Sequence, residues 1–314
     1  GDECMKSYQE MLNDLSECLK NGKFIYKDNI IIGDNSSGKS DVLKIMMQKD
    51  EQKKYYFIDA VNRSFEVEQV GEEPVENVSY SDEINRNRLK EENFNYRDSF
   101  YYLGVPRAVE DFYANYQFEL KKMMNEFLDI SFDIRLGEVG WEVYIDETEV
   151  ALSSGYQALL RIFIEILYME STRKEGTVII DEIDEFLSVK NSGKIFDFLR
   201  KKFPMLDFIV TTHSADLIAN TENANLILLH HENFEVLDAG DFASISQVYD
   251  IFSAVFEEKQ RKTQKQRIDD QLRVLLNNKM SGIWNEESTR WLQKLKNQEL
   301  TKAQKLIVRQ IETW

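Results

Sequence analysis

The feature that most constrains this chain is a short glycine-rich loop that follows three isoleucines. Residues 30–40 read IIIGDNSSGKS, and Gly33 to Ser40 fit the pattern G-x-x-x-x-G-K-S. Glycines let such a loop turn so that successive backbone amides point toward the oxygens of a phosphate. A helix that begins where the loop ends aims its N-terminus at the same anion. The sequence therefore predicts a buried strand, a phosphate-binding loop and a helix, in that order.

The last residues of the loop have distinct expected roles. Lys39 is placed to reach the β- and γ-phosphates of a nucleotide, and the Ser40 hydroxyl is placed to ligate Mg²⁺. The alternative is a glycine-rich turn with an unrelated lysine, which the preceding apolar strand and the following helix disfavour. The nucleotide-binding residues predicted in this loop are Gly33, Asn35, Ser36, Ser37, Gly38, Lys39, Ser40 and Asp41.

A second signal is an apolar stretch that ends in acidic residues. Residues 177–185 read TVIIDEIDE, which predicts a buried strand with Asp181 and Glu182 at its C-terminal end. Asp181 would hold the Mg²⁺ shell, and Glu182 would orient and polarise the attacking water. Many strands end in acidic residues, so this pattern gains its weight from the phosphate-binding loop.

Two further motifs each leave two interpretations open. Residues 152–157, LSSGYQ, either cap the helix expected over 157–169 or contact a nucleotide. Residues 210–218, VTTHSADLI, end a strand and place His213 at its tip. His213 is then either an ordinary loop histidine or a group that bonds the γ-phosphate and the attacking water.

The order of elements predicts an α/β fold with a largely parallel sheet and helices on its faces. We expect an exposed polar segment over 71–100, because it has few aliphatic residues. The predicted domains are an ATPase domain over 1–245, with an insertion at about 71–130, and a helical module over 246–314. The expected strands are 24–32, 55–60, 131–136, 141–145, 177–180, 207–211, 226–229 and 234–237.

Composition restricts the partners. The net charge is −17, which weighs against nucleic-acid binding by the whole surface. The tail from Lys259 to Trp314 differs, because it holds 13 Lys or Arg against 6 Asp or Glu. Only two cysteines occur, Cys4 and Cys18, and no apolar run is long enough to span a membrane. We therefore expect a cytoplasmic protein with reduced thiols and no membrane partner.

Together the four motifs resemble those of the ABC-type P-loop ATPases, within the soluble branch that includes the SMC, RecF and OLD proteins. GDNSSGKS is similar to the phosphate loop of that branch, LSSGYQ to its signature, IIDEIDEFL to its acidic strand and TTHS to its histidine loop. The resemblance covers about residues 23–240 and implies an ABC-type mixed sheet flanked by helices, with a helical insertion and a helical C-terminal tail.

The resemblance also implies a mechanism. Two copies would sandwich two ATP molecules, each with Mg²⁺, and each site would take its signature from the other copy. Ser153, Ser154 and Gly155 would then join the nucleotide-binding residues from across the interface. The catalytic residues would be Glu182, His213 and Lys39, and the metal ligands Ser40 and Asp181. Residues 183–188 match the D-loop, which would lie at the same interface.

The sequence departs from the family pattern at several places. Tyr156 stands where Glu or Gln is usual, and Asp41 stands where Thr is common. We find no convincing glutamine loop, for which Asn62 and Gln69 are the candidates. No long heptad run separates the phosphate loop from the signature, so a long coiled coil is excluded.

We therefore expect an ATPase whose ATP-dependent dimerisation or higher homo-oligomerisation regulates a separate effector. Compact ATPases that resemble this chain occur in bacterial anti-phage systems beside nuclease or toxin partners. One alternative is a DNA-binding repair or chromosome-maintenance ATPase that uses KQRKTQKQR at 259–267, and another is an ATP switch without turnover. Asp238 and Asp241 superficially resemble a nuclease motif, but acidic residues in a turn are usually just solvated. Three tryptophans of the tail, Trp284, Trp291 and Trp314, either dock a partner or close a local core.

Overall fold

The computed structural model of the chain divides into two compact units, residues 1–256 and 257–314. The predicted boundary after residue 245 stays a prediction. None of the described helices is both long and apolar enough to cross a membrane. The structure describes residues 7–33, 37–48, 50, 54–61, 63–76, 81–96, 100–102, 105–106, 108–230, 233–242, 244, 246–250, 264–280, 282, 284–298 and 300–313.

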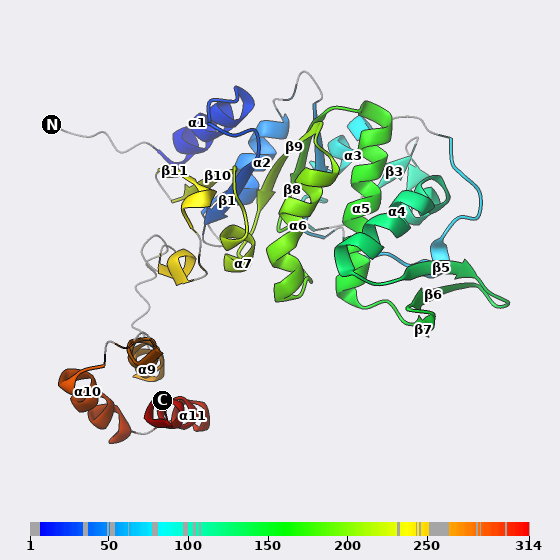
Figure 1. Cartoon of the computed structure of the whole chain (residues 1–314). Coiled ribbons are helices and arrows are strands. Elements are labelled where there is room, and N and C mark those ends of the chain that lie inside the picture. The colour runs from blue at the N-terminus through cyan, green and yellow to red at the C-terminus, as the bar shows by residue number, and fades with distance from the viewer. Residues whose placement is uncertain are drawn as a thin grey trace. The chain divides into compact units, whose positions relative to one another are not determined.

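A six-stranded sheet forms the centre of the first unit (Figure 1), with the strand order β11-β10-β1-β9-β8-β2. All neighbouring pairs are parallel except β10 and β11, so the sheet is mixed, as predicted. Its strands are β1 (Asn29–Gly33), β2 (Tyr55–Ile58), β8 (Gly176–Ile180), β9 (Leu206–Thr211), β10 (Asn225–Leu229) and β11 (Phe234–Asp238).

The three isoleucines of β1 divide between the two faces of the sheet, because successive side chains of a strand alternate. Ile31 packs with α1 (Tyr8–Lys20) and α2 (Lys39–Gln48), whereas Ile30 and Ile32 join the core on the opposite face. All three are at most 1% exposed. The predicted strand over 24–32 was too long at its start, because the chain bends over residues 24–27 before β1 begins.

The opposite face of the sheet carries the larger core. Its main helix is α5 (Ser154–Arg173), which is buried continuously from Ala158 to Met169. Its buried residues are mostly apolar, apart from the ion-paired Arg161 and Glu165, and they face all sides, so the helix lies between the sheet and other parts of the core. The same core contains residues of α4 (Tyr113–Leu128), α6 (Val189–Lys202) and α7 (Ala215–Ala219) (Figure 1).

The free edge of β2 is covered by α3 (Ser81–Arg88), and this corrects the prediction of an exposed segment over 71–100. The Asn85 side chain accepts from the Phe57 amide at 2.9 Å and donates to the Tyr55 carbonyl, as a neighbouring strand would. Arg88 is fully buried and forms a 2.6 Å ion pair with Glu165 of α5. Polar composition misled the prediction because these polar groups satisfy one another and the strand edge.

Smaller elements complete the first unit. A three-stranded antiparallel sheet contains the two strands predicted around residue 137. Its members are β5 (Phe132–Leu136), β6 (Trp141–Ile145) and β7 (Thr148–Val150). The first unit also contains the antiparallel strand pair β3 (Tyr101–Tyr102) and β4 (Val105–Pro106) and the short 3-10 helices η1 (Val67–Gln69), η2 (Val109–Phe112) and η3 (Ala239–Asp241).

The second unit contains α9 (Gln264–Met280), α10 (Glu286–Lys296) and α11 (Lys302–Thr313), which bury a leucine-rich core of their own. Trp284 and Trp291 pack against this core, which favours their local structural role. Trp314 lies outside the described residues.

Candidate functional site

The phosphate-binding loop joins the end of β1 to the start of α2, as predicted. The Lys39 ammonium folds back over the loop and donates to the Gly33 carbonyl at 2.6 Å, and its side chain is buried. Gly38 has φ +98°, a left-handed conformation that favours glycine. A Cβ on Gly33 would lie 2.2 Å from Ser37 Oγ and 2.9 Å from the Leu229 carbonyl. Both glycines of the motif are therefore required by the backbone.

The structure describes two of the other predicted loop residues, Ser37 and Asp41. Asn35 and Ser36 lie outside the described residues. Ser37 Oγ is buried, and within the described part of the chain it has no hydrogen-bond partner. The Asp41 carboxylate accepts from the Tyr8 hydroxyl of α1 at 2.8 Å, and burial raises the pKa of Tyr8 to about 12. Asp41 is thus tied to α1, and its contribution to nucleotide binding stays a prediction.

The two predicted metal ligands meet at the C-terminal end of the sheet. Ser40 Oγ donates to Asp181 Oδ2 at 2.8 Å, although 141 positions separate the residues in sequence. The Thr211 hydroxyl at the end of β9 donates to the other carboxylate oxygen. Asp181 is only 1% exposed, so hydrogen bonds from these donors, rather than solvent, stabilise the charge of its carboxylate.

Glu182 follows directly and has a strained backbone. Its φ is +49°, a conformation that non-glycine residues rarely adopt, and its amide donates to Thr211 Oγ1 at 2.7 Å. Burial, reinforced by the negative charge of Asp181, raises the pKa of the Glu182 carboxyl. Strain of this kind concentrates at functional sites, and a raised pKa suits a group that accepts a proton.

Two residues at this site escaped the sequence analysis. Asn95 Nδ2 donates to Asp181 Oδ2 at 2.7 Å and contacts Ser40 Oγ at 3.3 Å. Arg63 is 3% exposed and donates to the carbonyls of Asp181, at 2.7 Å, and Glu182, at 3.3 Å. Neither residue belongs to a motif, so only their positions in the fold identify them. We call Ser40, Asp181, Thr211 and Asn95 the metal edge.

The histidine motif lies at the end of β9, next to the metal edge. Thr212 Oγ1 donates to Asp184 Oδ1 at 2.6 Å, which joins this motif to the predicted D-loop. Ser214 caps α7 by accepting from the Leu217 amide. His213 lies between them and is exposed. Its position at the strand tip agrees with the sequence, and its bond to a nucleotide stays a prediction.

The signature motif, residues 152–157, forms what we call the signature turn at the start of α5. Ser153 is the N-cap residue and accepts from the Tyr156 amide at 3.3 Å, so the capping interpretation is correct. A Cβ on Gly155 would lie 3.2 Å from the Phe186 carbonyl, which places the predicted D-loop against this turn. Within the described part, the hydrogen bonds of Ser153 stay inside α5 and do not reach the phosphate-binding loop. The nucleotide role of Ser153, Ser154 and Gly155 therefore stays a prediction.

No family model matches the chain. It is 37% identical over 68 residues to the Septu protein PtuA of Bacillus mycoides (strain KBAB4), a match that covers 20% of this chain and 10% of that relative. The chain thus spans about a tenth of the curated relative it matches.

Similar solved structures include a dimeric ATP-binding cassette bound to ADP and phosphate in a post-hydrolysis state. It is 16% identical, with 68% of this chain and 86% of that chain covered and a TM-score of 0.37. A metal-chelate-type ABC transporter is 15% identical, with 74% and 79% covered and a TM-score of 0.37. The Smc head domain of Pyrococcus furiosus is 16% identical, with 44% and 37% covered and a TM-score of 0.29. Scores this low carry no inference alone. The strand order and the loop position define the fold.

The fold is therefore an α/β fold with a phosphate-binding loop at the end of β1, as the motif order predicted.

The donor set of this site fits Mg²⁺ shared with a nucleotide. The Ser40 hydroxyl and the Asp181 carboxylate offer oxygen atoms, which Mg²⁺ prefers. Among the described residues, no group of three or more His, Cys, Asp or Glu could hold a metal alone. Mg²⁺ commonly takes one or two protein oxygens and completes its shell with phosphates and water.

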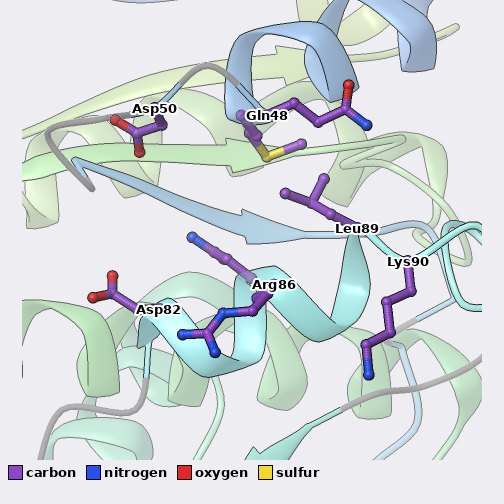
Figure 2. A pocket seen from close by; sticks show the side chains of 8 residues that line it. Gln48, Asp50, Asp82, Arg86, Leu89 and Lys90 are labelled. Atoms are coloured by element: carbon purple, nitrogen blue, oxygen red, sulfur yellow. The ribbon is translucent and has the colours of Figure 1, made fainter.

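A separate hollow of about 440 Å³ lies between the end of α2 and α3 (Figure 2). It is near the start of β2, where Asp50 accepts from the amides of Lys54 and Tyr55. Asp82, which also lines it, pairs with Arg173. Both carboxylates therefore have structural partners, and none of the residues that line the hollow belongs to the metal edge.

Proposed function

We propose that this chain binds Mg-ATP and hydrolyses it to ADP and phosphate. The observation that carries the proposal is the meeting of Lys39, Ser40, Asp181 and Glu182 at one end of the sheet. Open α/β sheets bind their ligands at the carboxyl ends of the strands, where these residues lie.

Each of these residues has one role in the proposed reaction. The loop amides and the Lys39 ammonium bind the phosphates and balance their charge. Mg²⁺, when bound, neutralises charge that develops between the β- and γ-phosphates. Glu182 orients the attacking water and accepts its proton, and His213 bonds the γ-phosphate. Arg63 positions Glu182, because it donates to the carbonyls of Asp181 and Glu182, which lie on either side of the Glu182 Cα.

We further propose that ATP joins two copies through their signature turns. Several exposed groups near this turn support the idea. Ser153 is exposed at the start of α5, and Phe186, whose carbonyl lies against Gly155, is 55% exposed. Large apolar side chains that stay exposed next to a motif are typical of a surface that a partner covers. Hydrolysis would then separate the two copies.

The biological output that we propose is regulation of a separate effector by this assembly, in anti-phage defence. The motif resemblance supports it, and so does the local identity with the Septu protein PtuA. The DNA-binding alternative rests on the basic strip at 259–267, and the net charge of −17 weighs against it.

The decisive experiment is the solution mass of Glu182→Gln with and without Mg-ATP, measured by mass photometry. The proposal expects a monomer that becomes a dimer with ATP and stays dimeric, because turnover is blocked. If the mass is the same with and without Mg-ATP, in protein shown by calorimetry to bind ATP, the proposed ATP-dependent dimer is contradicted. A rate of wild-type ATP hydrolysis that rises steeply with duplex DNA at low salt would favour the alternative.

A further inference from the structure

Asn95 uses both ends of its side-chain amide. Its Nδ2 donates to Asp181 Oδ2 at 2.7 Å and lies 3.3 Å from Ser40 Oγ. Its Oδ1 accepts from the Ala60 amide at 3.2 Å, just beyond the end of β2. The amide therefore connects the two predicted metal ligands to the edge strand of the sheet.

The backbone holds Asn95 in this position. Its φ is +51°, a left-handed conformation in which asparagine is one of the few favoured residues. The preceding Phe94 stacks on Phe57 of β2, with ring centroids 5.6 Å apart. Asn95 is thus fixed from one side by ring packing and from the other by its bond to Ala60. Its conformation fits a residue whose side chain must be aimed at one place.

We propose that Asn95 is a positioning residue of the metal edge. It holds the Asp181 carboxylate and the Ser40 hydroxyl in the arrangement that receives Mg²⁺ with the nucleotide. It does so from the side opposite Thr211, which bonds the other carboxylate oxygen. Outer partners that orient metal ligands typically change metal affinity by 10–100-fold when they are removed. The inference rests on the proposed ATPase function.

A purely structural role for Asn95 makes a different prediction. If Asn95 only ties the chain to Ala60, its loss lowers stability and leaves the Mg²⁺ dependence of nucleotide binding unchanged. If it positions the metal ligands, its loss changes that dependence. ADP affinity measured at a series of Mg²⁺ concentrations separates the two roles without any turnover.

The first variant is Asn95→Gly, which keeps the left-handed backbone and removes the amide. The matched control is Asn223→Gly, because Asn223 is exposed, has φ +54° and makes no side-chain hydrogen bond among the described residues. ADP binding is measured by calorimetry against free Mg²⁺, with EDTA as the metal-free point. Mg²⁺ is expected to raise ADP affinity. We expect Asn95→Gly to need about ten-fold more Mg²⁺ than the wild type to reach half of this rise, and to bind ADP as the wild type does in EDTA. The control should match the wild type.

The same titration separates failure of this inference from failure of the proposed function. Wild-type protein that binds ADP with a Mg²⁺ dependence identical to that of Asn95→Gly would overturn the positioning role and leave the ATPase proposal intact. Wild-type protein that binds neither ADP nor ATP in any condition would overturn both.

A second variant, Asn95→Asp, keeps the test informative where Asn95→Gly folds poorly. It retains an acceptor for Ala60 and suits the backbone, but it replaces the donor to Asp181 with a carboxylate. Without metal, two carboxylates then face each other, so we expect a lower melting temperature than in the wild type. With Mg²⁺ and ADP, we expect a larger rise in melting temperature than in the wild type. Equal melting temperatures in both conditions would contradict the proposal.

Discussion

The metal edge and the signature turn differ in how fully the chain satisfies their polar groups. At the metal edge, both carboxylate oxygens of Asp181 accept hydrogen bonds, from three side chains that belong to separate segments. At the signature turn, Ser153 is exposed and, among the residues that the structure describes, bonds only its own helix, while Phe186 nearby is 55% exposed. One region is complete within a single chain, and the other presents its groups outward.

This contrast bears on how the protein would work. Buried polar groups that are fully bonded form a rigid site before any ligand arrives. An exposed turn with apolar neighbours gains its function only when another surface covers it. We therefore infer that one copy binds the nucleotide and that catalysis depends on a second copy.

The largest expected effect comes from Glu182→Gln. Removing a general base typically costs 10²–10⁴-fold in rate, so phosphate release should fall by about that factor while ATP affinity stays near the wild-type value. Glu175→Gln is the matched control, because Glu175 is exposed and lies just before β8, outside the proposed site. Turnover close to the wild-type rate in Glu182→Gln would remove this residue as the water-orienting group.

Ser153→Arg tests the signature turn. We expect ATP binding to persist and turnover to fall by about 10²–10³-fold, as when one donor to developing charge is lost. Mixing Ser153→Arg with Glu182→Gln should restore part of the activity, because one composite site then combines an intact loop, base and signature.

Ser153→Arg also removes the N-cap of α5, which lowers the free energy of unfolding by about 1 kcal/mol. Ser7→Arg is the control, since Ser7 caps α1 with the same 3.3 Å bond. If mixing restores no activity while both variants bind ATP, the two copies do not exchange signatures.

Lys39→Ala tests the phosphate-binding loop, which lies beside the metal edge. A charge-assisted hydrogen bond contributes about 1.5–3 kcal/mol, so ATP affinity should fall by about 10–100-fold in calorimetry. Lys190→Ala is the control, because Lys190 lies in the first turn of α6 and is exposed. ATP affinity unchanged in Lys39→Ala would contradict the phosphate-loop assignment.

The smallest expected effect is on stability. The pKa of the Glu182 carboxyl is raised in the folded state, so the folded protein holds this proton more tightly than the unfolded chain does. The resulting contribution to the free energy of unfolding is fully present below the ordinary pKa of 4.5 and is lost as the pH rises through the folded-state pKa. Glu182→Gln should therefore melt slightly above the wild type at pH 8, and the difference should shrink toward pH 4. Glu175→Gln should show no such trend. Melting curves without nucleotide measure the effect.

Local motifs were enough to predict the phosphate-binding loop, the acidic strand and most of the sheet. Gly33 and Gly38 meet steric requirements that any chain with this loop shares, and a run of isoleucines specifies a strand buried on both faces. Ser40 and Asp181 were predictable as a pair because their motifs recur together in one family.

Only the tertiary structure revealed the rest of the site. Asn95 bonds Asp181 across 86 positions of sequence, and Arg63 bonds it across 118. The segment over 71–100 reads as polar and exposed, yet Asn85 and Arg88 of this segment seal the edge of β2. Composition determines how much apolar surface a segment can bury. Which polar groups pair in the interior depends on long-range packing, because each buried donor finds its acceptor on a distant part of the chain.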